Sequence, residues 1–454
     1  MELLVIDVAS ETDAWVAAFA DLERQRTDPA WLAGLRKGAM LGFARMGFPT
    51  TRQEDWRCTN VAPVSRAPFL QPGPAAASRF RAADIDRFAF GDWQRSQLVF
   101  MDGRFRPELS SPDALPGGAR VMPLREALAA SGPLVERHLG KLADPAAHPF
   151  TALNTAFIDD GAFIHLPAGA QMPHPVHLLF ISSGAERREE ATATHPRTLI
   201  VAEEGSRVMV VESFLGDWHG IYLTNAVTEI HAGDAAVVDH FKLQRESSGA
   251  FHIGTIQARL GRDAALTSMS ISLGAALARH DINVELSGPG ASATLNGLYV
   301  VDGTQHVDHH TVMDHAAPRC TSRELYKGVL GGRSRGVFNG TVMVRAGAAG
   351  TDSQQSNRNV LISEDAMVDT KPQLEILADD VKCTHAATVG QIDENAMFYL
   401  RSRGIDRDTA RNLMIHAFVS EVIHRIGIVP IRKGLDAQTF IRLPGKHEAD
   451  EVPS

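Results

Sequence analysis

Residues 371–390 read KPQLEILADDVKCTHAATVG and contain two short alternating segments separated by a pair of aspartates. In the first segment Leu374 and Ile376 alternate with polar neighbours, and in the second Cys383 and His385 do the same. A period of two residues is typical of a strand with one buried face. The stretch therefore predicts two β-strands joined by a sharp polar corner.

Turn signals recur along the chain at nearly constant intervals. Glycines at such turns stand at Gly205, Gly233, Gly261 and either Gly288 or Gly290, about 28 residues apart. Two further similar triplets, at residues 365–367 and 395–397, continue the spacing. A period of this length with strand texture and almost no helical signal is typical of a β-solenoid. An antiparallel sandwich, with turns every 8 to 12 residues or so, is the competing interpretation.

The fold class that we predict is mainly β, with a parallel β-helix core flanked by N-terminal and C-terminal helical regions. The period from Gly205 to Ala396 allows about seven coils, which at ~4.8 Å each make a rod on the order of 34 Å long. We expect three regions: a mainly helical or mixed region at 1–150 with a Pro/Ala-rich linker at 63–81, the β-helix at 151–400, and a helical region with a tail at 401–454.

Helical spacing of apolar residues marks both flanks. Residues 12–46 predict two helices, the second beginning with Asp28 as N-cap and Pro29 at the first helical position. A third helix is expected around residues 410–422, either capping the last coil of the rod or presenting one face to a partner. The polar tail at 446–454 is expected to be disordered.

Composition limits the classes of partner. The formal net charge of −9 over 454 residues argues against nucleic acid or an anionic membrane. No signal peptide and no apolar run of ~18 residues is present, which predicts a cytoplasmic protein. The three cysteines, Cys58, Cys320 and Cys383, make a disulfide framework unexpected and are too few to hold an iron–sulfur cluster. Any cluster would need ligands from another chain.

Two places carry candidate metal ligands. On an extended strand Cys383 and His385 share one face with Cβ atoms about 7 Å apart, and a thiolate beside an imidazole suits iron, zinc or an iron–sulfur cluster. The alternative is that Cys383 is a small core residue. His306, Asp308 and His310 would likewise line one face, and two imidazoles with a carboxylate resemble a mononuclear iron or zinc site. That row is more often a solvated outer face of a coil.

Nucleotide chemistry is not expected in this chain. The sequence contains no Gly-x-x-x-x-Gly-Lys-Ser/Thr loop, so nucleotide hydrolysis coupled to this protein would take place in a partner. Residues 332–336 fit a nucleophile-elbow pattern, but a strand and not a helix follows them.

Six stretches of the sequence carry a resemblance to a known family: residues 49–56 (PTTRQEDW), 320–329 (CTSRELYKGV), 336–340 (GVFNG), 351–357 (TDSQQSN), 371–390 and 398–405 (FYLRSRGI). Together they resemble the SufB/SufD family, the β-helical subunits of a bacterial iron–sulfur cluster assembly complex. The short N-terminal half, the scarcity of cysteines and the Val-Phe-Asn-Gly motif make the chain more similar to the SufD members than to the SufB members.

This resemblance implies a non-enzymatic scaffold that helps iron entry and cluster assembly. The family's functional histidine corresponds to His385, with Cys383 as a weaker candidate, and the iron or cluster would be transient and shared with a SufB-like partner bound through the β-helix. A SufC-like ATPase would bind the C-terminal helical region. Two other hypotheses stay open: a metal-dependent hydrolase using His306, Asp308 and His310, and a homodimeric β-helix that only binds partners.

Overall fold

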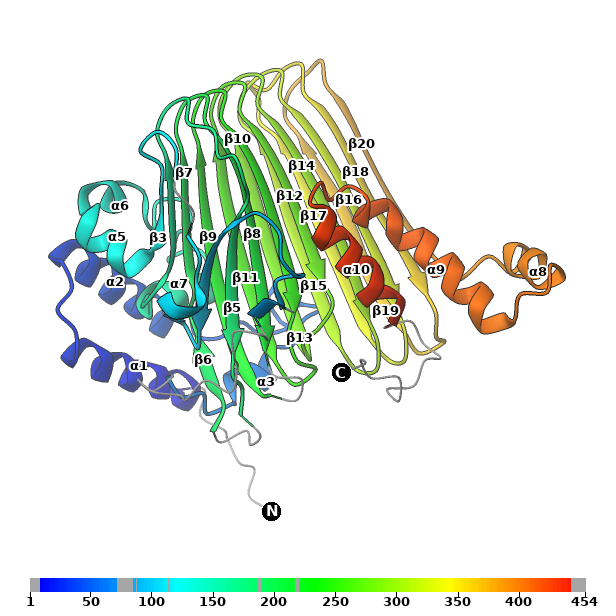
Figure 1. The fold of residues 1–454 in the computed structure, drawn as a ribbon, viewed down its shortest axis with the longest axis horizontal. Coiled ribbons are helices and arrows are strands. Elements are labelled where there is room, and N and C mark those ends of the chain that lie inside the picture. Colours follow the sequence, from blue (N-terminus) through cyan, green and yellow to red (C-terminus); the bar gives the residue numbers. More distant parts are fainter. Residues whose placement is uncertain are drawn as a thin grey trace.

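Fourteen strands, β7 to β20, wind into a rod of seven coils in the computed structural model (Figure 1). Odd-numbered strands pair in parallel in a first sheet, and even-numbered strands do so in a second sheet. The β-helix is therefore confirmed, and the sandwich interpretation is wrong. The strands of the coils are β7 Arg197–Ala202, β8 Arg207–Gly216, β9 Tyr222–Ala232, β10 Val237–Arg245, β11 Phe251–Leu260, β12 Ala265–Ser272, β13 Leu277–Leu286, β14 Ser292–Val301, β15 His306–His315, β16 Thr321–Leu330, β17 Arg335–Val344, β18 Asp352–Leu361, β19 Met367–Ile376 and β20 Lys382–Gly390.

The structure describes residues 9–71, 85–86, 88–112, 115–185, 190–216 and 220–441. Short strands begin both sheets and helices flank them. The strands are β1 Ser96–Met101, β2 Arg104–Phe105, β3 Arg120–Pro123, β4 Gly161–Leu166, β5 Val176–Ser182 and β6 Thr192–Thr194. The helices are α1 Ala9–Arg24, α2 Ala30–Met46, α3 Ala62–Ser65, α5 Leu124–Ala130, α6 Gly132–His138, α7 Pro149–Ala156, α8 Glu394–Ser402, α9 Arg407–Ile423 and α10 Val429–Ile441, with 3-10 turns at Glu54–Trp56 and Pro107–Leu109.

Glycines at the predicted turns allow the coils to stack closely. Gly205 adopts a φ of 63°, a left-handed conformation that favours glycine. Gly288 has another reason, because a Cβ there would lie 2.0 Å from the backbone nitrogen of Arg262 in the preceding coil. The regular glycine spacing in the sequence thus reflects close contacts between consecutive coils.

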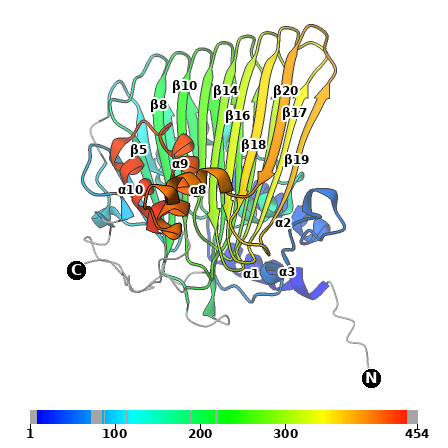
Figure 2. The same cartoon turned by 90° about the vertical axis from the view of Figure 1, so that its right-hand side faces the viewer.

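Helices cover the outer faces of both sheets (Figure 2). The N-terminal helices pack on the first sheet, where Trp15 and Phe43 join Phe251 in one apolar cluster. α9 packs on the second sheet, where Val419 and Val422 contact the cluster of strand residues that includes Leu325 and Val329. Inside the rod a continuous apolar cluster runs from β1 to the last coil. No described helix is long and apolar enough to cross a membrane.

Three local predictions were wrong. α9 lies across the outer face of the second sheet and does not cap the last coil, because its apolar stripe matches the outward-facing residues of β14 and β16. The triplet at 395–397 lies in α8, and the strands end at Gly390. α2 begins at Ala30 with Pro29 at its N-cap, while the Asp28 carboxylate instead forms an ion pair with Arg36.

The three-region division at 1–150, 151–400 and 401–454 stays a prediction. The expected linker at 63–81 is described only up to residue 71, where it includes the short helix α3. The expected tail at 446–454 lies outside the described residues.

Candidate functional site at the open end of the β-helix

The last coil leaves an unpaired edge on both sheets. β19 pairs with β17 and β20 pairs with β18, and neither strand has a second ladder partner among the described residues. In Figure 2 the last coil lies at one side of the row of strands, and most residues of β20 are exposed. A free strand edge offers backbone N–H and C=O groups to another chain. The open end is therefore a surface on which a further strand or coil can add.

Cys383 and His385 lie on the inward side of β20, at the mouth of the rod. They are in register with Ser353 and Gln355 of β18, whose side chains are buried inside it. Cys383 packs against the interior apolar cluster, and His385 shares its orientation because side chains alternate along a strand. His385 is exposed, since no coil follows β20.

The chemistry of the two side chains at the mouth differs. Burial raises the pKa of the Cys383 thiol, and Asp352 adds to the shift. Because the thiolate is the form that binds metal, a raised pKa makes Cys383 the weaker ligand. An imidazole binds metal through a neutral ring nitrogen, and His385 is the more exposed of the two side chains.

Two buried polar residues lie behind His385, at the same register position on the two preceding strands of the sheet. Gln355 of β18 is paired with His385, and Glu324 of β16 is paired with Gln355. The Gln355 side-chain amide donates a hydrogen bond of 2.7 Å to Oε2 of Glu324. Neither residue stands out in the sequence as a candidate site residue, although both lie in stretches that carry the family resemblance. Aligning the coils on their turns would have placed all three in one row.

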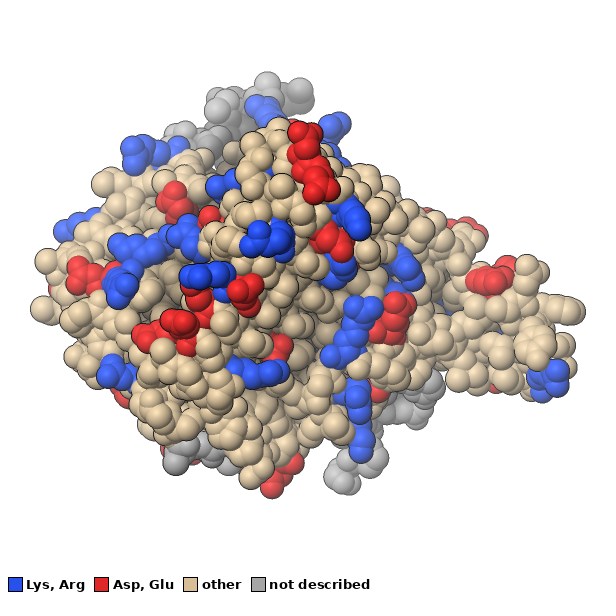
Figure 3. Space-filling model, turned by 90° about the horizontal axis from the view of Figure 1, so that it is seen from above, with Lys and Arg blue, Asp and Glu red and all other residues tan. Residues whose placement is uncertain are grey.

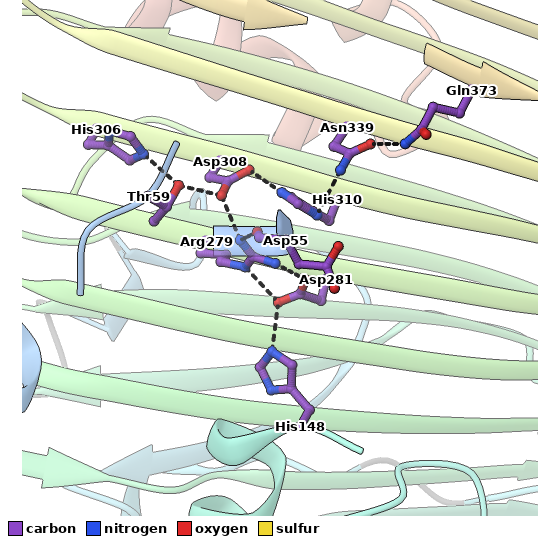
Figure 4. Close-up of polar contacts among 10 residues, drawn as sticks. All are labelled: Asp55, Thr59, His148, Arg279, Asp281, His306, Asp308, His310, Asn339 and Gln373. Atoms are coloured by element: carbon purple, nitrogen blue, oxygen red, sulfur yellow. Dashed lines mark hydrogen bonds and ion pairs between the residues drawn. The ribbon is translucent and has the colours of Figure 1, made fainter. Parts of the chain in front are cut away.

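The His306, Asp308 and His310 row lies on the outward side of β15 and is held in a network of hydrogen bonds and ion pairs (Figure 4). Thr59 Oγ1 lies 2.9 Å from His306 Nε2 and donates a 2.5 Å hydrogen bond to Asp308 Oδ2. His310 Nε2 lies 3.1 Å from the other carboxylate oxygen of Asp308. The three side chains share one face of the strand, as predicted. Asp308 lies between the two histidines and contacts His310 directly and His306 through Thr59.

Arg279 stands at the centre of this network. Its guanidinium contacts Asp308 at 2.9 Å and Asp281 at 2.8 Å, and it donates to the backbone oxygen of Asp55 at 2.6 Å. The Trp56 ring covers it, with 3.7 Å between Cζ and the ring centroid. Burial alone would raise the pKa of Asp308, but Arg279 and His310 outweigh it and lower that pKa well below its ordinary value.

The expectation that this row is a solvated outer face is wrong, because the N-terminal segment covers it. Asp308 is fully buried beneath the segment that contains Trp56 and Thr59. A buried cation already neutralises the carboxylate. A metal site on this row stays a prediction that the geometry does not favour.

Metal ligands are sparse throughout the described residues. No three or more His, Cys, Asp or Glu side chains among them are grouped so that they could hold a metal ion. An ion at the open end would take His385 from this chain and its other ligands from water or a second chain.

Comparisons with known proteins agree with this architecture. The model of the SUF system FeS cluster assembly SufBD core domain matches residues 181–418, and that of the SufBD protein N-terminal region matches residues 18–178. The iron–sulfur cluster assembly protein SufD of Escherichia coli is 32% identical, over 88% of this chain and 90% of that protein. A SufBD family protein of Synechocystis is 31% identical over 89% and 90%, and SufD of Bacillus subtilis is 27% identical over 90% and 93%.

Fold and site define a class of protein: a β-helical protein with an open terminal coil and an exposed histidine at its mouth. The chain belongs to the SufBD family of the SUF iron–sulfur cluster assembly system, since the two family models together cover most of it.

Proposed function

We propose that this chain is a SufD-like, non-enzymatic scaffold subunit that works in the cytoplasm with a SufB-like partner and a SufC-like ATPase. It helps iron enter the complex and helps assemble the iron–sulfur cluster. The observation that supports this most directly is the position of His385, exposed on the inward face of an unpaired last coil. Iron and cluster are cargo here and are held only transiently.

The shortage of ligands explains why a partner is needed. Iron–sulfur clusters take about four protein ligands, mostly thiolates. The open end supplies one imidazole and one thiol whose pKa is raised by burial. A cluster at this position is therefore shared, and the partner that adds to the open edge provides the remaining ligands.

A charge placed on the open end should prevent binding of the SufB-like partner. Ile376 and Val389 are 40% and 47% exposed in the last coil and would be covered by an added coil. We expect the double variant Ile376→Lys, Val389→Lys to fold but no longer co-elute with the SufB-like chain, because burying two unpaired ammonium groups is costly. Leu41→Lys, at a 63% exposed position on α2, is the matched control. Unchanged co-elution of the double variant would contradict docking at this end.

α8 is the surface that we assign to the ATPase. It projects beyond the last coil, where uncharged atoms dominate the view in Figure 3, and Phe398 and Tyr399 are 74% and 58% exposed on it. Exposed aromatic pairs of this kind are typical of binding hot spots.

Truncating this aromatic pair should weaken ATPase binding selectively. Alanine at Phe398 and Tyr399 together is expected to lower affinity for the SufC-like chain roughly thirtyfold, as loss of a hot spot of about 2 kcal/mol would. Affinity for the SufB-like chain should stay within about twofold of wild type, because that partner uses the coil edge. Equal losses for both partners, or no loss for the ATPase, would refute this assignment.

A further inference from the structure

The inward row that begins at His385 ends in a buried carboxyl group. Glu324, Gln355 and His385 are consecutive in register on β16, β18 and β20. Neighbouring strands are ~4.8 Å apart, so Glu324 lies about 10 Å behind the mouth. Glu324 and Gln355 are 5% and 3% exposed, whereas His385 is open to solvent.

The carboxyl of Glu324 has room for a further electrostatic partner. Its Oε2 accepts the hydrogen bond from Gln355, and the hydroxyl of Thr311 is the other side chain that interacts with the carboxyl. The Gln355 Oε1 is buried and has no hydrogen-bond partner among the described residues. A buried oxygen atom without a partner is rare in folded proteins, and this one belongs to the row that leads to the open end.

None of the described side chains that act on Glu324 carries a positive charge. Burial raises its pKa to about 7, and the side chains that act against this shift, Thr311 and Gln355, are uncharged. Burial also raises the pKa of Tyr299 and Tyr326 and lowers that of His309 to about 3, so these neighbouring groups are neutral near pH 7. The Glu324 carboxyl therefore changes charge in the physiological range.

We propose that Glu324 is the buried counter-charge for a divalent metal ion held at His385, with Gln355 fixing the carboxyl in the row that leads to the mouth. The inference rests on the proposed role of His385. When the cation arrives, the carboxylic acid loses its proton to solvent and becomes a carboxylate, which offsets one of the two positive charges. Glu324 is a positioning residue here and does not bind the ion directly.

The arrangement makes iron binding dependent on pH. Attraction over about 10 Å in a medium of effective dielectric constant ~20 is worth at least about a tenfold change in affinity for a divalent ion. Protonation of Glu324 below its pKa of about 7 removes that attraction. Iron should therefore bind more tightly as pH rises through this value.

The test is anaerobic titration with Fe²⁺ of the full chain in complex with its SufB-like partner, followed by calorimetry in buffers of different ionisation enthalpy. Glu324→Gln should weaken binding about tenfold at pH 8 and release roughly half a proton less per ion at pH 6.5. Glu324→Asp should restore part of both effects. Glu375→Gln removes an exposed carboxylate from the last coil, which also contains His385. It should change neither the affinity for Fe²⁺ nor the number of protons released, because solvent screens that charge.

The outcomes separate this inference from the proposed function. Wild-type affinity and proton release in Glu324→Gln, with binding still lost in His385→Ala, would overturn the counter-charge and leave the His385 site standing. Binding that survives His385→Ala would overturn both. The infrared carbonyl band of the protonated buried carboxyl needs no variant: at pH 6.5 it should weaken when Fe²⁺ is added, and an unchanged band would contradict the inference.

Discussion

Replacing His385 with alanine is expected to abolish cluster assembly while folding and complex formation stay intact. His385 is exposed and makes no described contact that holds the rod together, so the free energy of unfolding should change by less than about 0.5 kcal/mol. Loss of even an outer-shell partner of a metal costs about 10- to 100-fold in affinity or activity, so loss of the ligand should exceed this range. The measurement is iron and acid-labile sulfide bound per complex.

A second histidine variant shows whether the effect of His385→Ala is specific to that position. The His424 side chain is 61% exposed near the end of α9, away from the mouth, and His424→Ala should assemble clusters at the wild-type level. Cys383→Ser should have a smaller effect than His385→Ala, because the raised pKa keeps the thiol protonated. A wild-type cluster yield in His385→Ala would refute the site assignment.

Replacing Arg279 with methionine is expected to destabilise the chain by about 3–5 kcal/mol. The substitution preserves apolar volume but leaves two buried carboxylates, Asp281 and Asp308, without their cation. It also removes the contacts that hold Trp56 and the backbone of Asp55 against the rod. Urea unfolding measures the loss, which should include release of the N-terminal segment.

The matched control for Arg279 is an exposed ion pair. Arg259 and Glu285 are 2.8 Å apart with side chains 53% and 28% exposed, and Arg259→Met should cost no more than about 1 kcal/mol. A loss below about 1 kcal/mol for Arg279→Met would show that the network is not needed for stability.

The same network fixes the direction of a pH effect. The pKa of Asp308 is lowered in the folded chain from its ordinary value of 3.8. Its contribution to stability is therefore fully present above that value and is lost as pH falls through the lowered pKa. In Arg279→Met the free energy of unfolding should fall less steeply as the pH is lowered through the acid range.

The sequence predicted the rod because its physical cause is local and repeated. Each coil needs a tight corner, which Gly205 and Gly288 provide, and alternation along each strand buries one face. Because the period is regular, the sequence predicts about seven coils, and the structure has seven. The count nevertheless depended on a triplet at 395–397 that lies in α8, because such a short motif is compatible with either conformation.

What the sequence could not predict depends on contacts between distant parts of the chain. Thr59 and Asp308 are separated by 249 positions, and no local pattern indicates that the N-terminal segment covers β15. The sequence does not show the row of Glu324, Gln355 and His385 for another reason. The pairs Glu324–Gln355 and Gln355–His385 span coils of unequal length, so the three residues fall in one row only after the coils are aligned on their turns.

Co-expression of this chain with its SufB-like and SufC-like partners, followed by iron and sulfide analysis of the eluted protein, tests the central claim most directly. We predict a stable mixed complex that carries iron and sulfide when His385 is intact and lacks them in His385→Ala. A chain that elutes alone or as a self-dimer, or that carries its own metal without these partners, would contradict the account.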